Sequence, residues 1–100
     1  MMIVPVQATP SQTLQVTLNG QLVQFNIYQK NTGMFIDVYV ANAVVIIGVI
    51  CENLNWIVRN AYLGLIGDLF FFDTQGNTDP YYTGLGARYL LAYVAPLTTD

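Results

Sequence analysis

Apolar and polar residues alternate along three short runs in the first 40 positions of the chain. Such alternation is typical of a β-strand with one buried and one solvated face. Asn19-Gly20 separates the first two runs, and this dipeptide favours a type I′ hairpin because both residues tolerate the positive φ that the turn requires. Asn31-Thr32-Gly33 provides a second turn signal. The pattern predicts strands over residues 13–18, 21–29 and 34–40, with Asp37 facing outward.

The pattern changes after a further turn near residues 41–43. Residues 44–50 read VVIIGVI, and this continuous β-branched run predicts a strand buried on both faces, either in the core or by a neighbouring subunit. We favour the neighbouring subunit. Residues 52–61 mix polar and apolar positions and fit either a bulged strand or an irregular turn.

Two more strands are predicted in the second half, over residues 68–72 and over residues 85–95, where Tyr89, Leu91 and Tyr93 alternate with their neighbours. Phe70, Phe71 and Phe72 are consecutive, so at least one of them must point away from the local core.

Short strands separated by turn signals, with no convincing 3.6-residue period, predict an all-β fold. We expect a single small antiparallel β-sandwich or β-barrel of about six to seven strands. One hundred residues are enough for one domain, residues 1–100, with loose ends near residues 1–2 and 96–100.

The composition of the chain indicates an unusually apolar surface. Apolar residues make up 54% of the chain and charged residues 9%, against a usual ~25% charged, so much apolar surface is expected to meet something other than water. This favours an obligate oligomer or a part of an assembly. The nearly apolar run at residues 41–51 is too short for a membrane-spanning helix, which needs about 20 residues. The N-terminus lacks the layout of a secretory signal, which predicts a cytoplasmic product.

Charged and reactive side chains are scarce. Three basic and six acidic residues give a net charge of −3, which does not suit a phosphate backbone, so direct nucleic-acid binding is not expected. The chain has no histidine and its carboxylates are scattered, so we expect neither enzyme activity nor a cofactor. Cys51 is expected to be a buried small apolar residue.

The loop at residues 73–80 contains an oxygen-rich group, Asp73, Asn77 and Asp79, that could surround a calcium ion. It lacks the EF-hand spacing and the closing glutamate. We favour the alternative that Asp73 and Asn77 cap turns while Gly76 takes a positive φ, and we expect no metal site.

Several aromatic residues and one arginine are candidates for an interface, because such side chains are enriched where proteins meet. Each has an alternative. A tryptophan in so small a domain is more often a core residue, and Tyr81 and Tyr82 could pin their own loop. Arg88 could pair with Asp68 or Asp79 to order the loop, but for any one such pair we favour solvated charges, whose interaction contributes ~0–1 kcal/mol. The candidates are Trp56, Tyr62, Phe71, Tyr81, Tyr82 and Arg88.

Gly84 and Gly86 stand close to these tyrosines, and we expect them to permit a tight backbone path. A lone GxG pair is weak support for nucleotide binding, and no lysine follows it.

A set of short segments, in order, carries a family resemblance: LNG, NIYQK, AYLGLIGDL, DTQG, DPYYTGLG and RYLLAY. Together they resemble the small baseplate plug proteins of contractile-tailed phages, of the cyanophage type. The resemblance implies a virion structural protein, made in the host cytoplasm, at the centre of the tail baseplate. It also implies packing against tube and hub-spike proteins, a role in closing the tube end, and release or rearrangement on contraction. We expect a homo-oligomer with three- or six-fold symmetry.

A different class of function also fits the composition. A free-standing small β-barrel, with a mouth lined by tyrosines and phenylalanines, could hold an apolar or sugar ligand. Such a module would be a soluble monomer with a formed cavity, whereas an assembly part would expose an apolar outer face.

Overall fold

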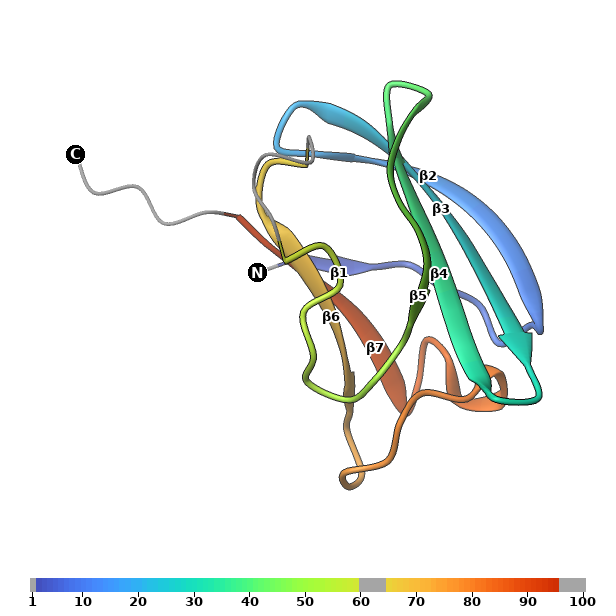
Figure 1. Cartoon of the computed structure of the whole chain (residues 1–100). Helices are drawn as coiled ribbons and strands as arrows, with labels where there is room; N and C mark the ends of the chain where they lie inside the picture. Colours follow the sequence, from blue (N-terminus) through green and yellow to red (C-terminus); the bar gives the residue numbers. More distant parts are fainter. Residues whose placement is uncertain (1, 60–64, 96–100) are drawn as a thin grey trace.

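The computed structural model describes residues 2–59 and 65–95, which form two antiparallel sheets packed into a sandwich (Figure 1). The first sheet has the order β2-β3-β4-β5 and the second has the order β1-β7-β6. The first comprises β2 (Ser11–Leu18), β3 (Gln21–Lys30), β4 (Gly33–Val40) and β5 (Ala43–Ile50). The second comprises β1 (Met2–Val4), β6 (Asp68–Asp73) and β7 (Tyr89–Val94), with a 3₁₀ turn, η2 (Tyr82–Gly84), before β7. The all-β prediction is confirmed as a sandwich, and the closed-barrel alternative is wrong.

Two tight hairpins set the register of the larger sheet. Asn19 and Gly20 have φ of 51° and 79°, as the predicted type I′ turn requires, and Leu18 pairs with Gln21 across it. Ala41 and Asn42 also both have positive φ, 50° and 67°, between β4 and β5. Local turn chemistry therefore fixes which face of each strand points inward.

The core lies between the two sheets and is built from the inward faces of their strands. A fully buried side chain of this size contributes about 1.5–3 kcal/mol through removal of its apolar surface from water. The largest fully buried side chains are those of Phe25, Phe71, Leu18, Ile27, Met34, Ile36, Leu65, Leu69 and Leu91.

The three consecutive phenylalanines of β6 alternate between the two faces of the smaller sheet. Phe71 is 0% exposed and belongs to the core, whereas Phe70 and Phe72 are half-buried on the outer face. The prediction that one phenylalanine must point away from the core is confirmed. The choice of Phe71 as an interface residue is wrong for the folded chain, because strand alternation turns it inward.

Asp37 lies on the outer face of β4, opposite the side of Ile36 and Val38, but it is buried rather than solvated, with 8% of its area exposed. Tyr28 and the backbone of Gly48 cover it and donate hydrogen bonds to it. The predicted orientation is therefore correct, and its burial comes from neighbouring strands that the local pattern does not contain.

The ends and the connections differ in part from the prediction. Met2 is paired with Tyr93 in β1, so the loose N-terminal end does not include it. Residues 52–59 form an irregular segment with an isolated bridge at Asn53. The last strand begins at Tyr89 rather than near residue 85. The expected loose end at residues 96–100 lies outside the described residues.

Candidate assembly surface

The outer face of the four-stranded sheet is divided into a polar and an apolar half. Over β2 and β3 the exposed side chains are mostly polar, with Leu22, 47% exposed, as the exception. Two polar pairs are hydrogen-bonded across the strands: Thr13 Oγ1 donates to Asn26 Oδ1 over 2.9 Å, and Gln15 Nε2 donates to Gln24 Oε1 over 3.2 Å. This half suits contact with water.

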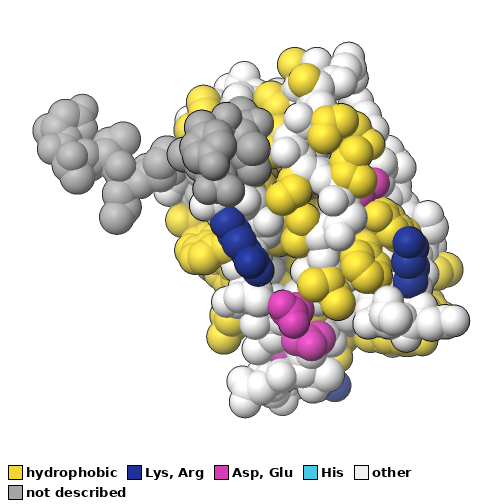
Figure 2. All heavy atoms as spheres, viewed as in Figure 1, with side chains coloured by type: hydrophobic (Ala, Val, Ile, Leu, Met, Phe, Trp, Pro, Cys, Tyr) yellow, Lys and Arg dark blue, Asp and Glu magenta, His cyan; other side chains and the backbone are white. Residues whose placement is uncertain are grey.

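The other half, over β4 and β5, is apolar (Figure 2). Val44 and Ile47 are 57% and 56% exposed, and Ile50 is 41% exposed. Tyr39 lies opposite Val44 and Phe35 opposite Ile50 in the register of the two strands. No charged residue occurs in the sequence between Asp37 and Glu52. We call Phe35, Tyr39, Val44, Ile47 and Ile50 the β4–β5 apolar surface.

Asp37 holds β5 in an irregular path beneath this surface. Its carboxylate accepts hydrogen bonds from the Gly48 backbone N–H over 2.8 Å and from Tyr28 Oη over 3.0 Å. Asn26 Nδ2 lies 3.5 Å from the second oxygen. The register shifts between β4 and β5 on either side of Val38, and Gly48 takes a φ of 69°. A shift of this kind is a β-bulge, which changes the spacing of the side chains that face outward.

Tyr28 joins this buried group to the exposed rings. Burial and the hydrogen bond to Asp37 raise the pKa of Tyr28 above its ordinary value. Its ring stacks on Phe35 at 6.0 Å between centroids, and Lys30 Nζ lies 5.5 Å and 5.4 Å from the two ring centroids. The lysine thus covers one end of the β4–β5 apolar surface through cation–π contacts.

β5 is an edge strand, and its outer edge is open. Among the described residues, β5 makes its backbone hydrogen bonds to β4 and none on its other side. The edge of β6, by contrast, is covered by residues 54–57: Leu54 N donates to the carbonyl of Phe71 and Ile57 N donates to that of Leu69. An open, apolar edge without lysine or proline is a ready site for pairing with another strand.

A second apolar group lies on the outer face of the smaller sheet. Trp56 packs edge to face on Phe70 at 5.3 Å between centroids, and Phe70 lies 5.9 Å from Phe72. Trp56 is 47% exposed and Leu54 is 65% exposed. We call Leu54, Trp56, Phe70 and Phe72 the aromatic cluster. The core alternative for Trp56 is wrong, because nearly half of the residue's surface is exposed and its ring packs on Phe70.

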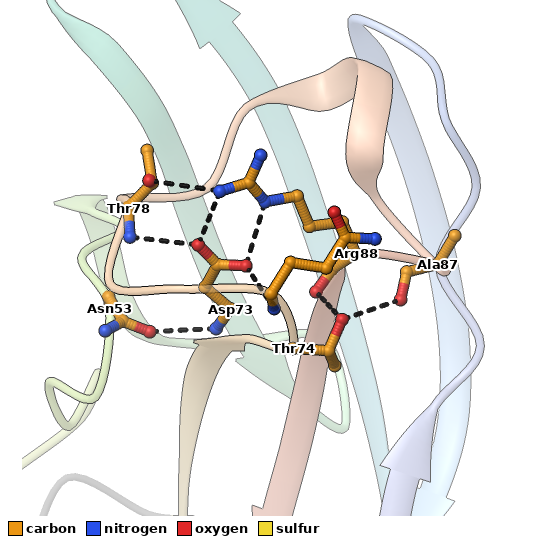
Figure 3. Close-up of polar contacts among 7 residues, drawn as sticks. Asn53, Asp73, Thr74, Thr78, Ala87 and Arg88 are labelled. Atoms are coloured by element: carbon orange, nitrogen blue, oxygen red, sulfur yellow. Dashed lines mark hydrogen bonds and ion pairs between the residues drawn. The ribbon is translucent and has the colours of Figure 1, made fainter.

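Arg88 pairs with Asp73, not with either of the two carboxylates proposed from the sequence (Figure 3). Its Nε and Nη2 donate to the two carboxylate oxygens of Asp73, each over 2.9 Å. Asp68 instead accepts hydrogen bonds from backbone N–H groups at residues 58 and 59, and Asp79 accepts one from Asn53 N. Arg88 therefore closes the 73–88 loop within its own domain.

Asp73 also caps the turn that follows it, as predicted. It accepts hydrogen bonds from the backbone N–H groups of Gln75 and Thr78. The hydrogen bonds from Arg88, supported by these backbone donors, hold the pKa of Asp73 well below its usual range. The same pairing raises the pKa of the Arg88 guanidinium. Gly76 does not have the predicted positive φ.

The two tyrosines of the loop have different surroundings. Tyr81 is 48% exposed, whereas Tyr82 packs against the core and donates its backbone N–H to Gln29 Oε1 over 3.2 Å. The predicted tight path of the two glycines is confirmed. A Cβ on Gly84 would lie 2.7 Å from the Tyr89 ring, and one on Gly86 would lie 2.5 Å from a backbone oxygen.

The described residues offer little to a small ligand or a metal ion. They contain no group of three or more His, Cys, Asp or Glu side chains that could hold a metal, and the carboxylates of Asp73 and Asp79 are engaged in loop hydrogen bonds. A shallow hollow between the β3–β4 turn and residues 78–81 is lined mostly by polar side chains. Residues 2–59 and 65–95 form a sandwich and not the closed barrel that the ligand-binding alternative assumed.

Cys51 is buried, as predicted, with 2% of its area exposed, and burial raises the pKa of its thiol. A protonated thiol in the core is a poor nucleophile.

The structure does not bring the predicted interface residues together. Trp56 and Tyr81 are exposed, Tyr82 is half-buried, Phe71 is core, Arg88 is bound to Asp73, and Tyr62 lies outside the described residues. The most exposed apolar strand supplies residues that were not singled out, namely Val44, Ile47 and Ile50. The sequence signal for them was the uncharged run at residues 44–50, and the alternative that the core covers this strand on both faces is wrong.

The described residues thus form a small β-sandwich domain with exposed apolar side chains on the outer face of each sheet. The family model described as cyanophage baseplate Pam3 plug gp18 matches residues 1–96, and the chain belongs to this family. No curated protein matches the chain. Family membership assigns it a structural role in a phage tail baseplate, with other baseplate proteins as partners and a location in the virion. In the described part of the chain, no helix is long and apolar enough to span a bilayer.

Proposed function

We propose that this chain is a plug component at the centre of a contractile-tail baseplate, where it packs against tube and hub-spike proteins and helps to close the tube end. The observation that carries the proposal is that a member of the plug family exposes two apolar surfaces, one on the outer face of each sheet. These are the β4–β5 apolar surface and the aromatic cluster. Surfaces on both faces let a small domain join neighbours on two sides.

The proposed action is mechanical and needs no catalytic group. A stable protein contact buries about 1,200–2,000 Å² in total, and aromatic residues are enriched at its centre. The aromatic cluster has the residue types that are typical of such a centre. Contacts of this kind depend on shape and apolar burial, so they break when contraction moves the neighbouring proteins. The proposal includes synthesis in the host cytoplasm, a three- or six-fold arrangement in the baseplate, and release or rearrangement on contraction.

Co-purification tests the packing. The chain is co-expressed with the tube and hub-spike proteins of the same tail and captured in low salt and in about 1 M sodium chloride, where charges more than ~3 Å apart are screened. The unmodified chain is expected to retain both partners under both conditions. Trp56→Glu places a carboxylate in the aromatic cluster and is expected to lose them.

Gln15→Glu is the matched control, because it adds the same charge to an exposed position on the polar half of the larger sheet. It is expected to bind like the unmodified chain. Failure of the unmodified chain to bind either partner would contradict the proposal, as would equal loss of binding in the two variants.

A further inference from the structure

The large exposed side chains of β5 are spaced symmetrically about Ile47. Val44, Ile47 and Ile50 are exposed on the outer face, at a spacing of three residues. An unbulged strand would repeat every two residues, and the spacing of three follows from the shifts in register against β4. Between them, Val45 is buried, and Ile46 and Val49 pack against the core.

In antiparallel pairing, directly opposed residues lie on the same face of the sheet. Two copies of β5 can therefore pair well only in a register that places outer residues opposite outer residues. Centring the pair on Ile47 places the outer side chains of Val44, Ile47 and Ile50 opposite one another, and the one uneven position sets core-packed Ile46 opposite Gly48, which has no side chain. Moving the centre by a half or a whole residue in either direction opposes outer to inner side chains. The matched pairs are Val44 with Ile50, Val45 with Val49, Ile46 with Gly48, and Ile47 with itself.

We propose that two copies of this chain pair through β5, antiparallel and edge to edge, with a two-fold axis at Ile47. The contact joins two four-stranded sheets into one of eight strands and makes the β4–β5 apolar surfaces of the copies continuous. The absence of charged residues from β5 means that no like charges oppose each other across the axis.

Another edge of the same chain is a poorer partner for β5. The exposed side chains of β2 are Ser11, Thr13, Gln15 and Thr17, which would place polar groups beside Val44 and Ile47. The edge of β6 is already covered by residues 54–57. Self-pairing of β5 is the arrangement that matches apolar with apolar along the strand.

This inference does not rest on the proposed place of the chain in the tail. A contact across a two-fold axis joins copies in pairs, so the chain in solution is expected to contain an even number of subunits, which agrees with six copies in the baseplate and not with three. Pairing between two copies would cover the open edge of β5 before the chain binds its baseplate neighbours.

Cysteine cross-linking tests the register on the full chain. Ile47→Cys places two thiols directly opposite each other, and mild oxidation is expected to give a covalent dimer that is reversed by reductant. Val44→Cys alone is the matched control, because its two copies lie six positions apart, about 20 Å at the rise of a strand. This exceeds the ~7 Å limit between Cα atoms that a disulfide can bridge. A mixture of Val44→Cys and Ile50→Cys chains is expected to cross-link.

Ile47→Lys tests the same contact without oxidation, through the dissociation constant of the dimer. Two ammonium groups would face each other at the axis, and the dissociation constant of the dimer is expected to rise by more than about tenfold, since like charges at a contact are repulsive. Gln15→Lys, with the same charge on the edge strand at the other side of the sheet, is expected to leave the constant unchanged. Both positions are partly or fully exposed, and circular dichroism verifies that each variant folds.

Light scattering of the unmodified chain over a concentration series completes the test. A monomer at every concentration, a trimer that Ile47→Cys does not cross-link, or cross-linking of Val44→Cys as fast as Ile47→Cys would each overturn the inference. The first two results leave the proposed packing against tube and hub-spike proteins intact.

Discussion

Replacing Asp37 with alanine is predicted to destabilise the protein and to loosen β5 in particular. The Asp37 carboxylate is the acceptor for the Gly48 N–H and the Tyr28 hydroxyl, at 2.8 Å and 3.0 Å, and it has 8% of its area exposed. Its loss removes the attachment of the irregular middle of β5 to β4. The same change leaves the Tyr28 hydroxyl beneath the sheet surface without this acceptor.

The expected size of the effect follows from these contacts. A hydrogen bond to a charged group contributes about 1.5–3 kcal/mol. Two such bonds set an upper range of about 3–6 kcal/mol. Gly48 is an exposed residue, so water can replace the lost acceptor of its N–H, and removing the carboxylate also removes its own desolvation cost. We therefore expect Asp37→Ala to lower the free energy of unfolding by about 2–3 kcal/mol, a large part of the usual 5–15 kcal/mol.

Urea unfolding followed by far-ultraviolet circular dichroism measures this loss, which corresponds to a fall of about 1–2 M in the midpoint. Amide hydrogen exchange is expected to accelerate most in residues 44–50. Asp79→Ala is the control, because the Asp79 carboxylate accepts one hydrogen bond, from Asn53 N, at an exposed position. The reasoning is refuted if Asp37→Ala costs no more than Asp79→Ala, or if exchange in β5 does not change.

Three further predictions follow from burial, backbone geometry and charge. Phe71→Ala is expected to cost about 3–5 kcal/mol in urea unfolding, and Phe72→Ala on the outer face less than about half of that; equal costs would contradict the alternation in β6. Gly86→Ala is expected to lower the melting temperature more than Gly20→Ala. Both glycines have a φ near 80°, but only at Gly86 would an added Cβ lie against a backbone oxygen, at 2.5 Å. Equal changes in melting temperature would contradict this close approach. The pKa of Asp73 is lowered in the folded chain, so below about pH 4 the unfolded chain binds more protons than the folded one and stability falls as the pH drops further. Asp73→Asn is expected to make the free energy of unfolding depend less on pH in this acid range. An unchanged pH profile would contradict the assignment of this acid dependence to Asp73.

The sequence predicted the hairpins of the larger sheet well because their signals are local. Asn19-Gly20 specifies its turn by the backbone angles that these residues tolerate, and the alternation on either side specifies the inward faces. At residues 44–50 apolar and polar residues do not alternate, so the sequence does not show which face of this strand points inward. A continuous apolar run shows that a strand will be covered, but not whether its own domain or another molecule covers it.

The interface candidates were less predictable because their surroundings are long-range. The partner of Arg88 depends on the β6–β7 register, which places Asp73 opposite Tyr89 and so beside the arginine. Three nearby carboxylates could not be ranked from spacing alone. The half-exposure of Trp56 likewise depends on Phe70 projecting from the outer face of β6, a direction that three identical neighbours in sequence do not reveal.

Electron cryo-microscopy of extended tails from a phage that encodes this chain tests the central claim most directly. The account predicts density for a seven-stranded sandwich at the baseplate end of the tube, in contact with tube and hub-spike proteins and with the aromatic cluster buried in a contact. A sandwich located elsewhere in the virion, or one at the baseplate whose aromatic cluster faces solvent, would contradict it.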